Sequence, residues 1–466
     1  MTRGPVVLKF GGTSVGDADA IRRLVRHVAA AAQRGAAVVV VSALSGVTDR
    51  LLQLAAGASA GDDAAIAAGI EELRERHARA AAEVAADPAD VIATTARDLE
   101  ELRNLLHAVA TLKDASPRTR DAIAAYGELL SSRIVRSACV AGGLKASWVD
   151  ARRVVVTDDS FGAALPLTDR TEAAVAEHVA PVLARGEVPV LGGYIGATAD
   201  GVTTTLGRGG SDYSAAIVGA ALNASEIQIW TDVDGMMTAD PRVVPATHVV
   251  PRLSFEEASE LAYFGAKVLH PSTILPAIAK AIPVRILNSR RFEQSGTLIT
   301  AGSQVDAPLA ALACKRHVTV IDITSTRMLM AHGFLRRVFE VFERCRTPID
   351  VVSTSEVSIS VTIDDNRRLD EIIAELSAFA EVRVESEMAI LCAVGDGLRQ
   401  DPRLASRILG SLEQFPLRMV SQAASRRNVT VVLHEASAAA AMVHLHRTFF
   451  AREVDTTAVP QSVAAS

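Results

Sequence analysis

Near the amino terminus, a lysine and two adjacent glycines stand where a strand leads into a helix. Residues Val6–Phe10 form an apolar run with Lys9 close to its end, and Gly11 and Gly12 follow directly. The backbone N–H groups of adjacent glycines can approach an anion, and the start of a helix adds positive potential. The order differs from a Walker A motif, in which the lysine follows the glycines. The string therefore predicts a phosphate site, with a plain tight turn as the alternative.

A second glycine-rich string, LGRGGSD, occupies residues 206–212 ahead of a helical run. It places Arg208 among glycines, where a guanidinium can hold a carboxylate through two parallel hydrogen bonds. Asp212 stands near the start of the predicted helix 213–221, and an acidic residue there can simply complement the helix dipole. Together with the Lys9 string, the presence of Arg208 and Asp212 favours a functional role.

Three later strings suit a nucleotide, although each alone is weak. Strand-end Thr231 and Asp232 suit a ribose or an adenine edge, and Lys267 suits phosphate. Asp-Gly and Asp-Pro pairs are also common turn formers, and His270 before a proline is interpreted as structural. The strings are TDVDG at 231–235, DPR at 240–242 and FGAKVLHP at 264–271.

A glutamate on a predicted helix is the remaining candidate. Glu128 lies in the string YGELLSS at 126–132, where its carboxylate can receive the ammonium group of a substrate. The alternative is a solvated helix carboxylate, which would be the default without the neighbouring strings.

The elements that must position these residues read as α/β over the first 300 residues. Runs without polar alternation, such as Ala36–Val41, are typical of parallel strands buried on both faces. Residues 60–112 are Ala-rich with apolar stripes at helical spacing, and predict a helical hairpin that acts as a lid or a dimer element. Strands separated by helices imply a mainly parallel sheet between helix layers. Further predicted strands are Lys145–Val149, Pro189–Leu191, Glu226–Thr231 and Val284–Leu287.

The remainder of the chain contains an internal repeat with an offset of about 70 residues. Each copy reads strand, helix, strand, strand, helix, which is the order of a small α+β module. One sheet face of each copy lacks predicted helix cover, so pairing with another copy, in the same or a second chain, is expected. Neither copy concentrates catalytic residue types, which favours a regulatory role. The first copy comprises Val318–Ile323, Gly333–Arg344, Ile349–Ser353, Val357–Ile363 and Leu369–Phe379, and the second comprises Ala389–Val394, Arg403–Gln414, Arg418–Gln422, Val429–Leu433 and Ala436–Phe449.

Composition excludes several classes of protein. The 466 residues are 49% hydrophobic and 22% charged, which is ordinary for a globular protein and excludes a disordered chain or a coiled-coil rod. A net charge of −6 argues against a nucleic-acid or membrane binder. No apolar run approaches the ~20 residues that span a bilayer, and the first is too short for a signal peptide. The 4 scattered cysteines suit free thiols in a reducing cytosol, so a cytoplasmic location is expected.

Taken together, the strings resemble the aspartokinase family over essentially the whole chain. The tail repeat looks like two ACT domains, the amino-acid-sensing modules of that family. The resemblance implies the amino-acid kinase fold over residues 1–300, ACT domains over 317–387 and 388–466, and a strand lent to the second ACT domain by residues 308–316. The matching strings are KFGGTSV at the start, VVSALSGVTD from residue 40, GE-x-x-S-S at 127–132, LGRGGSD, TDVDG and FGAKVLHP.

This resemblance implies a reaction and a role for each residue in the cleft. ATP and L-aspartate would give ADP and 4-phospho-L-aspartate, the first step towards lysine, threonine and methionine, with Mg²⁺ accompanying the nucleotide. Lys9 would stabilise the transferring phosphoryl group and Asp212 would organise Lys9. The remaining implied roles are phosphate binding by Gly11, Gly12 and Thr13, substrate binding by Ser42, Thr48, Glu128 and Arg208, and nucleotide binding by Thr231, Asp232, Arg242 and Lys267.

The first repeat resembles the lysine-inhibited, monofunctional subclass. Asp350 and Glu356 would then meet the ammonium groups of lysine, and N–H groups around Gly333 would meet its carboxylate. Ala331 stands where that subclass often has serine; losing one hydrogen bond of about 0.5–1.5 kcal/mol implies weaker inhibition. The implied effector residues are Met328, Gly333, Phe334, Leu335, Asp350, Ser355, Glu356 and Val357.

Two other functions remain as alternatives. One is a catalytically inactive amino-acid sensor that acts through its ACT pair, which the intact Lys9, Arg208 and Asp212 disfavour. The other is a kinase of the same fold that acts on glutamate, acetylglutamate or carbamate, which the Glu128 string and the ACT pair disfavour. The resemblance also implies a homodimer or a dimer of dimers formed through the ACT domains.

Overall fold

A computed structural model describes residues 4–265, 271–302, 308–325, 333–422 and 426–450 of the chain. Within it the chain forms two compact units, each of which combines several segments. The first unit is Met1–Met236, Val249–Ala262 and Lys267–Gln304, and the second is Met237–His248, Tyr263–Ala266 and Val305–Ser466. In the part of the chain that the structure describes, no helix is long and apolar enough to cross a membrane.

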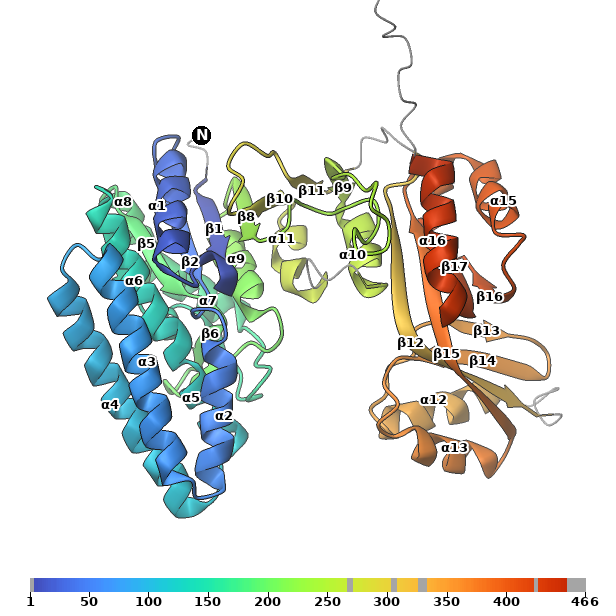
Figure 1. The fold of residues 1–466 in the computed structure, drawn as a ribbon, viewed down its shortest axis with the longest axis horizontal. Helices are drawn as coiled ribbons and strands as arrows, with labels where there is room; N and C mark the ends of the chain where they lie inside the picture. Colours follow the sequence, from blue (N-terminus) through green and yellow to red (C-terminus); the bar gives the residue numbers. More distant parts are fainter. Residues whose placement is uncertain (1–3, 266–270, 303–307, 326–332, 423–425, 451–466) are drawn as a thin grey trace, which may run out of the picture. The chain divides into compact units, whose positions relative to one another are not determined.

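The first unit is built on a mainly parallel sheet (Figure 1). Strand β1 is central, with β2 and β8 parallel to it on either side, and β10 and β11 form the antiparallel pair. All residues of β2 are buried, as its unbroken valine run predicts. The six strands predicted here are confirmed to within one residue at each end. In spatial order the strands are β3 (Ala146–Val149), β5 (Val188–Gly192), β2 (Ala37–Val41), β1 (Val6–Phe10), β8 (Glu226–Thr231), β10 (Val284–Asn288), β11 (Thr297–Thr300) and β9 (Arg252–Ser254).

Helices cover the sheet of the first unit, and a smaller sheet adjoins it. Helices α1 and α6 share one hydrophobic core with β1 and β2, while α9 packs against β1, β8 and β2. The predicted helical hairpin is confirmed as α3 and α4, which lie side by side in Figure 1. The α-helices are α1 (Ala18–Ala32), α2 (Val47–Ser59), α3 (Asp63–Val84), α4 (Pro88–Leu112), α5 (Pro117–Ala124), α6 (Tyr126–Ala141), α7 (Thr168–His178), α8 (Ala180–Ala184), α9 (Gly210–Ala221), α10 (Phe255–Tyr263) and α11 (Leu275–Ala279); the 3₁₀ turns are η1 (Gly12–Ser14), η2 (Ala151–Arg153) and η3 (Pro271–Ile274); the small sheet contains β4 (Val156–Thr157), β6 (Ile195–Thr198) and β7 (Thr203–Thr205).

The second unit has one antiparallel sheet that runs through both predicted repeats. Two long strands, β12 and β15, pair along their whole length, and each contains a left-handed residue at the same point of the repeat. These residues are His317 and Glu387, with φ of 59° and 58°. The strands in spatial order are β13 (Val352–Thr354), β14 (Ser358–Ile363), β12 (Ala311–Thr324), β15 (Glu381–Val394), β17 (Asn428–His434) and β16 (Leu417–Ser421), and the helices are α12 (Phe334–Arg344), α13 (Leu369–Ser377), α14 (Gly397–Gln400), α15 (Pro402–Ser411) and α16 (Glu435–Phe450).

The long strands connect the two repeats through their exchanged halves. Residues 311–315 of β12 pair with residues 390–394 of β15, so this part of β12 lies in the sheet of the second repeat. Val320, Ile390 and Val432 of this sheet are fully buried within the single chain. The expectation that another copy, in the same or a second chain, buries one sheet face of each repeat stays a prediction.

A segment that interrupts the first unit along the chain belongs to the core of the second unit. Ala239 and Val244 join the buried side chains of α15 and α16 in one cluster. The N–H of Leu312 donates to the carbonyl oxygen of Thr238, and the Thr238 hydroxyl is hydrogen-bonded to Nε2 of His446 at 2.9 Å. Residues 237–248 are therefore held by the second repeat.

Candidate active site

The first unit contains a cavity of about 700 Å³ at the carboxyl ends of β1, β2 and β8. From β1, the chain continues to β2 on one side and later returns through β8 on the other. Such a change of direction leaves a crevice outside the strand ends, where ligands of α/β proteins bind. Eleven of the predicted residues line this cavity, namely Lys9, Gly11, Gly12, Thr13, Ser42, Thr48, Glu128, Arg208, Asp212, Thr231 and Asp232.

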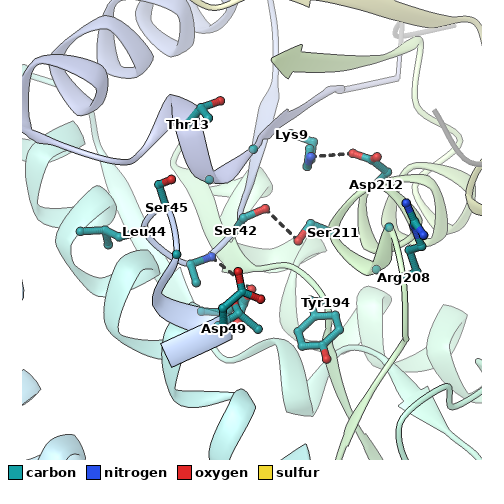
Figure 2. Close-up of a pocket in the computed structure, with 18 of the residues that line it drawn as sticks. Lys9, Thr13, Ser42, Leu44, Ser45, Asp49, Tyr194, Arg208, Ser211 and Asp212 are labelled. Atoms are coloured by element: carbon teal, nitrogen blue, oxygen red, sulfur yellow. Dashed lines mark hydrogen bonds and ion pairs between the residues drawn. The ribbon is translucent and has the colours of Figure 1, made fainter. Parts of the chain in front are cut away.

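A buried ion pair lies at the end of β1. Nζ of Lys9 is 2.7 Å from Oδ1 of Asp212, and the two side chains are 11% and 13% exposed. Figure 2 shows them pointing toward one another. A Cβ built on Gly11 would lie 3.5 Å from Nζ of Lys9, so the glycine lets the backbone run close to the cation. The pair places a compact positive charge, fixed in direction, beside the turn that contains Gly11 and Gly12.

Arg208 is presented by a loop that only glycine can form. Gly207 and Gly209 have φ of 74° and 72°, which is strained for residues with a Cβ. Helix α9 begins at Gly210, three residues earlier than the sequence predicts, so Asp212 lies in its first turn. Figure 2 shows Arg208 beside the cavity. Among the described residues no hydrogen bond or ion pair of its guanidinium is found, so the fork is available to a ligand carboxylate.

Glu128 is a buried carboxyl group that has no charged partner in the part of the chain that the structure describes. The residue is 2% exposed, Oε1 accepts a hydrogen bond from the Ala43 N–H at 3.1 Å, and Oε2 has no partner among the described residues. Burial raises the pKa of Glu128 to about 8, and the Ala43 N–H offsets this only in part. A ligand ammonium beside Oε2 would restore the charged form of the carboxyl.

Hydroxyl groups connect the walls of the cavity. The Ser42 hydroxyl donates to the Ser211 hydroxyl at 2.9 Å, an interaction drawn in Figure 2. The Ser131 hydroxyl in turn donates to the carbonyl oxygen of Ser42 at 2.8 Å. Thr48 lies in the first turn of α2 and lines the same cavity. These contacts fix the loop after β2 against α6 and α9.

Sequence reasoning missed Asp121, a residue that positions part of the cavity wall. Its buried carboxylate accepts hydrogen bonds from the N–H of Gly162 at 2.9 Å, the N–H of Thr205 at 2.9 Å and the Thr205 hydroxyl at 2.8 Å. Gly162 lines the cavity, so Asp121 holds this wall from behind. An isolated aspartate in helix α5 gives no signal in the sequence, because its partners are 41 and 84 residues away.

The predicted nucleotide residues divide into three groups. Thr231 and Asp232 line the cavity, and the Thr231 hydroxyl donates to the Asp232 carboxylate at 3.2 Å. Arg242 does not line it; this residue belongs to the second unit and pairs with Asp240 at 2.7 Å, with its side chain 80% exposed. Lys267 lies outside the described residues. The nucleotide roles of Arg242 and Lys267 stay predictions.

The predicted effector residues lie in the first repeat. Gly333, with φ of 86°, precedes α12, whose first residues are the buried Phe334 and the exposed Leu335. The Asp350 side chain pairs with Lys315. Met328, like Ala331, lies outside the described residues, and Ser355, Glu356 and Val357 form the exposed turn between β13 and β14.

Comparison with known proteins identifies the family. Residues 4–288 match the amino acid kinase family, and residues 391–449 match an ACT domain. The chain is similar to the lysine-sensitive aspartokinase 3 of Escherichia coli K12, with 36% identity that covers 96% of this chain and 99% of the relative. It is 37% identical to the chloroplastic aspartokinase 1 of Arabidopsis thaliana, which covers 95% of this chain and 80% of the relative.

Solved structures show the same similarity in three dimensions. The structure of E. coli aspartokinase III with aspartate and ADP (R-state) has a TM-score of 0.82 and 35% identity, covering 96% of this chain and all of that chain. Its complex with lysine and aspartate (T-state) has a TM-score of 0.81 and 36% identity, covering 96% and 99%. The sequence-based expectation of the family is thus confirmed, and this chain belongs to the aspartokinase family.

Proposed function

We propose that this protein is an aspartate kinase, which transfers the γ-phosphoryl group of ATP to the β-carboxylate of L-aspartate. The products are ADP and 4-phospho-L-aspartate, the first intermediate towards lysine, threonine and methionine. The observation that carries this proposal is one cavity with the Lys9–Asp212 pair and the Gly11–Gly12 turn together with Arg208 and Glu128. One set suits a phosphoryl group, and the other suits the two charged groups of an α-amino acid.

The chemistry requires positioning and positive charge rather than a general base. A β-carboxylate oxygen is already ionised at neutral pH, so it attacks the γ-phosphorus directly while the bond to the β,γ-bridging oxygen breaks and ADP leaves. Negative charge on the transferring group and on the leaving oxygens is stabilised by fixed positive groups. Lys9, held by Asp212 at 2.7 Å, is such a group, and the N–H groups after β1 add to it.

Arg208 and Glu128 orient the amino acid. The unpaired guanidinium of Arg208 binds the α-carboxylate, and Oε2 of Glu128, which lacks a partner among the described residues, receives the α-ammonium. Ser42 and Thr48 line the cavity between them. With both α-substituents held, only the β-carboxylate is free to approach the phosphoryl group.

The nucleotide binds beside Thr231 and Asp232, with Arg242 and Lys267 as further proposed contacts. Carboxylates at the phosphate end of the cavity, Asp212 and Asp232, fit Mg²⁺, which usually combines one or two carboxylates with phosphate oxygens and water. When bound, Mg²⁺ supplies charge neutralisation on the phosphates.

The tail repeats support feedback control by an amino acid. Lysine is the proposed effector, since a similar aspartokinase is named lysine-sensitive and another structure holds lysine. Asp350, Glu356 and the N–H groups near Gly333 suit its two ammonium groups and its carboxylate. A homodimer, or a dimer of dimers, formed through the repeats is proposed as the assembly in which this control operates.

The test is an assay of ADP and aspartyl hydroxamate formation with aspartate, ATP and Mg²⁺. Lys9→Ala is expected to lower kcat at least about a hundredfold, because one electrostatic group of this kind contributes about 3–4 kcal/mol. Lys280→Ala is the matched control, since Lys280 makes a surface pair with Glu172 at 3.5 Å. Retention of more than a tenth of the activity in Lys9→Ala, or equal rates with glutamate and aspartate, would refute the proposal.

A further inference from the structure

An internal lysine already occupies the carboxylate that is proposed to bind the effector. The Asp350 side chain is 3% exposed, and its Oδ1 lies 2.7 Å from Nζ of Lys315. The same ammonium lies 2.9 Å from Oδ2 of Asp364, whose side chain is 37% exposed. Lys315 therefore joins a buried carboxylate to a half-exposed one in the second unit.

Tyr263 completes this cluster. Its ring lies 5.1 Å from Nζ of Lys315, within the range of a cation–π interaction. Its hydroxyl donates to the carbonyl oxygen of Ile349 at 3.2 Å. Burial and the neighbouring Asp350 charge raise the pKa of Tyr263 to about 12, so the hydroxyl keeps its proton.

The cluster still lacks positive charge and donors. Asp350, Asp364 and Lys315 sum to one excess negative charge. The buried Oδ2 of Asp350 receives no well-aligned hydrogen bond among the described residues, and the Tyr263 hydroxyl, which donates to Ile349, is its nearby donor. Buried carboxylate oxygens are normally hydrogen-bonded, and an orphaned one is costly. Burial raises the pKa of Asp350 despite the contact with Lys315. The carboxylate is therefore incompletely satisfied by its internal partner.

Access decides how an effector can use Asp350. An ammonium from solvent cannot reach a side chain that is 3% exposed while Lys315 covers Oδ1. Lys315, at 18% exposure, is less buried than Asp350 and keeps a second, more exposed partner in Asp364. We propose that the effector binds by exchange: its ammonium displaces the Lys315 ammonium from Asp350, and Lys315 acts as a built-in competitor that sets the effector concentration needed. This inference rests on the proposed control by lysine.

The exchange has a consequence for Tyr263. One ammonium replaces another at Asp350, so the charge of the carboxylate environment is preserved, but the displaced Lys315 leaves the face of the Tyr263 ring. Tyr263 is the last residue of α10 and precedes the string that carries Lys267. Effector binding thereby alters the residue that immediately precedes that string.

Calorimetric titration of the full-length protein with L-lysine tests the exchange. In Lys315→Met the competitor is absent and Asp350 is unpaired, so the Kd for lysine is expected to fall at least tenfold relative to the wild type. Lys280→Met removes the same charge from a surface pair and is expected to leave the Kd unchanged. An equal or weaker affinity in Lys315→Met, with Lys280→Met unchanged, would overturn the proposal.

A second variant covers the case in which Lys315→Met does not fold. Lys315→Gln keeps a hydrogen-bond donor beside Asp350 without the charge, and the same tightening is expected. Binding in either variant without measurable wild-type binding also supports the exchange, whereas no binding by wild type and variant at millimolar lysine refutes it. Wild-type kinase activity without lysine is measured separately, so a failure of the proposed reaction is seen independently of the titration.

Discussion

Aspartate binding should depend on pH through one carboxyl group. Glu128 is 2% exposed and has a pKa of about 8 against an ordinary value of 4.5. The difference corresponds to about 5 kcal/mol that opposes ionisation in the free enzyme. At pH 7 only about a tenth of the molecules then carry the Glu128 charge. If the substrate ammonium binds the ionised form, the KM for aspartate at pH 7 should be about tenfold above its high-pH limit.

A pKa of about 8 for Glu128 predicts a specific pH profile for aspartate binding. Below pH 8, kcat/KM for aspartate should rise about tenfold per pH unit and then level off, while the KM for ATP changes little. Calorimetry in buffers of different ionisation enthalpy should show about 0.9 protons released per aspartate bound at pH 7. Glu72→Gln, which alters a surface carboxylate paired with Arg50, should leave the profile unchanged.

Stability provides an independent check on Glu128. A folded-state pKa raised above the unfolded value means that ionisation costs stability, which is lost as pH rises from about 4.5 to 8. Glu128→Gln should therefore unfold at higher temperature than the wild type at pH 8, with a smaller gain at pH 5, and lose affinity for aspartate. An aspartate KM that is flat between pH 6 and 8.5 in the wild type would refute the reasoning.

Other predictions concern single buried or unpaired groups. The buried His77 has a pKa of about 4, lowered by burial, so the free energy of unfolding should decrease as pH falls from 6.5 toward 4. Urea unfolding should show a loss of about 2 kcal/mol at pH 5 in the wild type, and this loss should be absent in His77→Phe. The same pH dependence in both proteins would contradict this. Asp121→Asn should cost about 1–3 kcal/mol, because an amide NH₂ would face backbone donors, and it should raise the aspartate KM; normal values of both would argue against its positioning role. Arg208→Lys should raise the aspartate KM more than the ATP KM, since an ammonium cannot form the two-point contact. Equal increases in both KM values would contradict the proposal that Arg208 binds the α-carboxylate of aspartate.

Local patterns and glycine strings predicted the fold and most of the candidate cavity. The buried strand before Gly11 and the glycine loop around Arg208 are each defined by a few adjacent residues, so the sequence alone predicts them. Arg242 shows the limit, because its position depends on the unit that residues 237–248 join. Asp121 was missed since its three hydrogen bonds connect distant segments.

Lys315 marks a different limit of sequence reasoning. The charges of Lys315 and Asp350 are both visible in the sequence. Their contact joins positions 35 residues apart, so no local pattern indicates it. The sequence therefore presented Asp350 as open to an effector, whereas the structure shows it paired and buried. A carboxylate predicted as a binding residue has to be checked for an internal cation before its affinity is considered.

Two short segments that adjoin the proposed nucleotide residues along the chain belong to the second unit. Strand β8 ends at the cavity wall with Thr231 and Asp232, and from Met237 the chain already belongs to the second unit, where Thr238 is hydrogen-bonded to His446. Tyr263 likewise belongs to that unit, and its hydroxyl donates to the carbonyl oxygen of Ile349 in the first repeat. Each repeat thus fixes one segment that is covalently continuous with a proposed nucleotide residue.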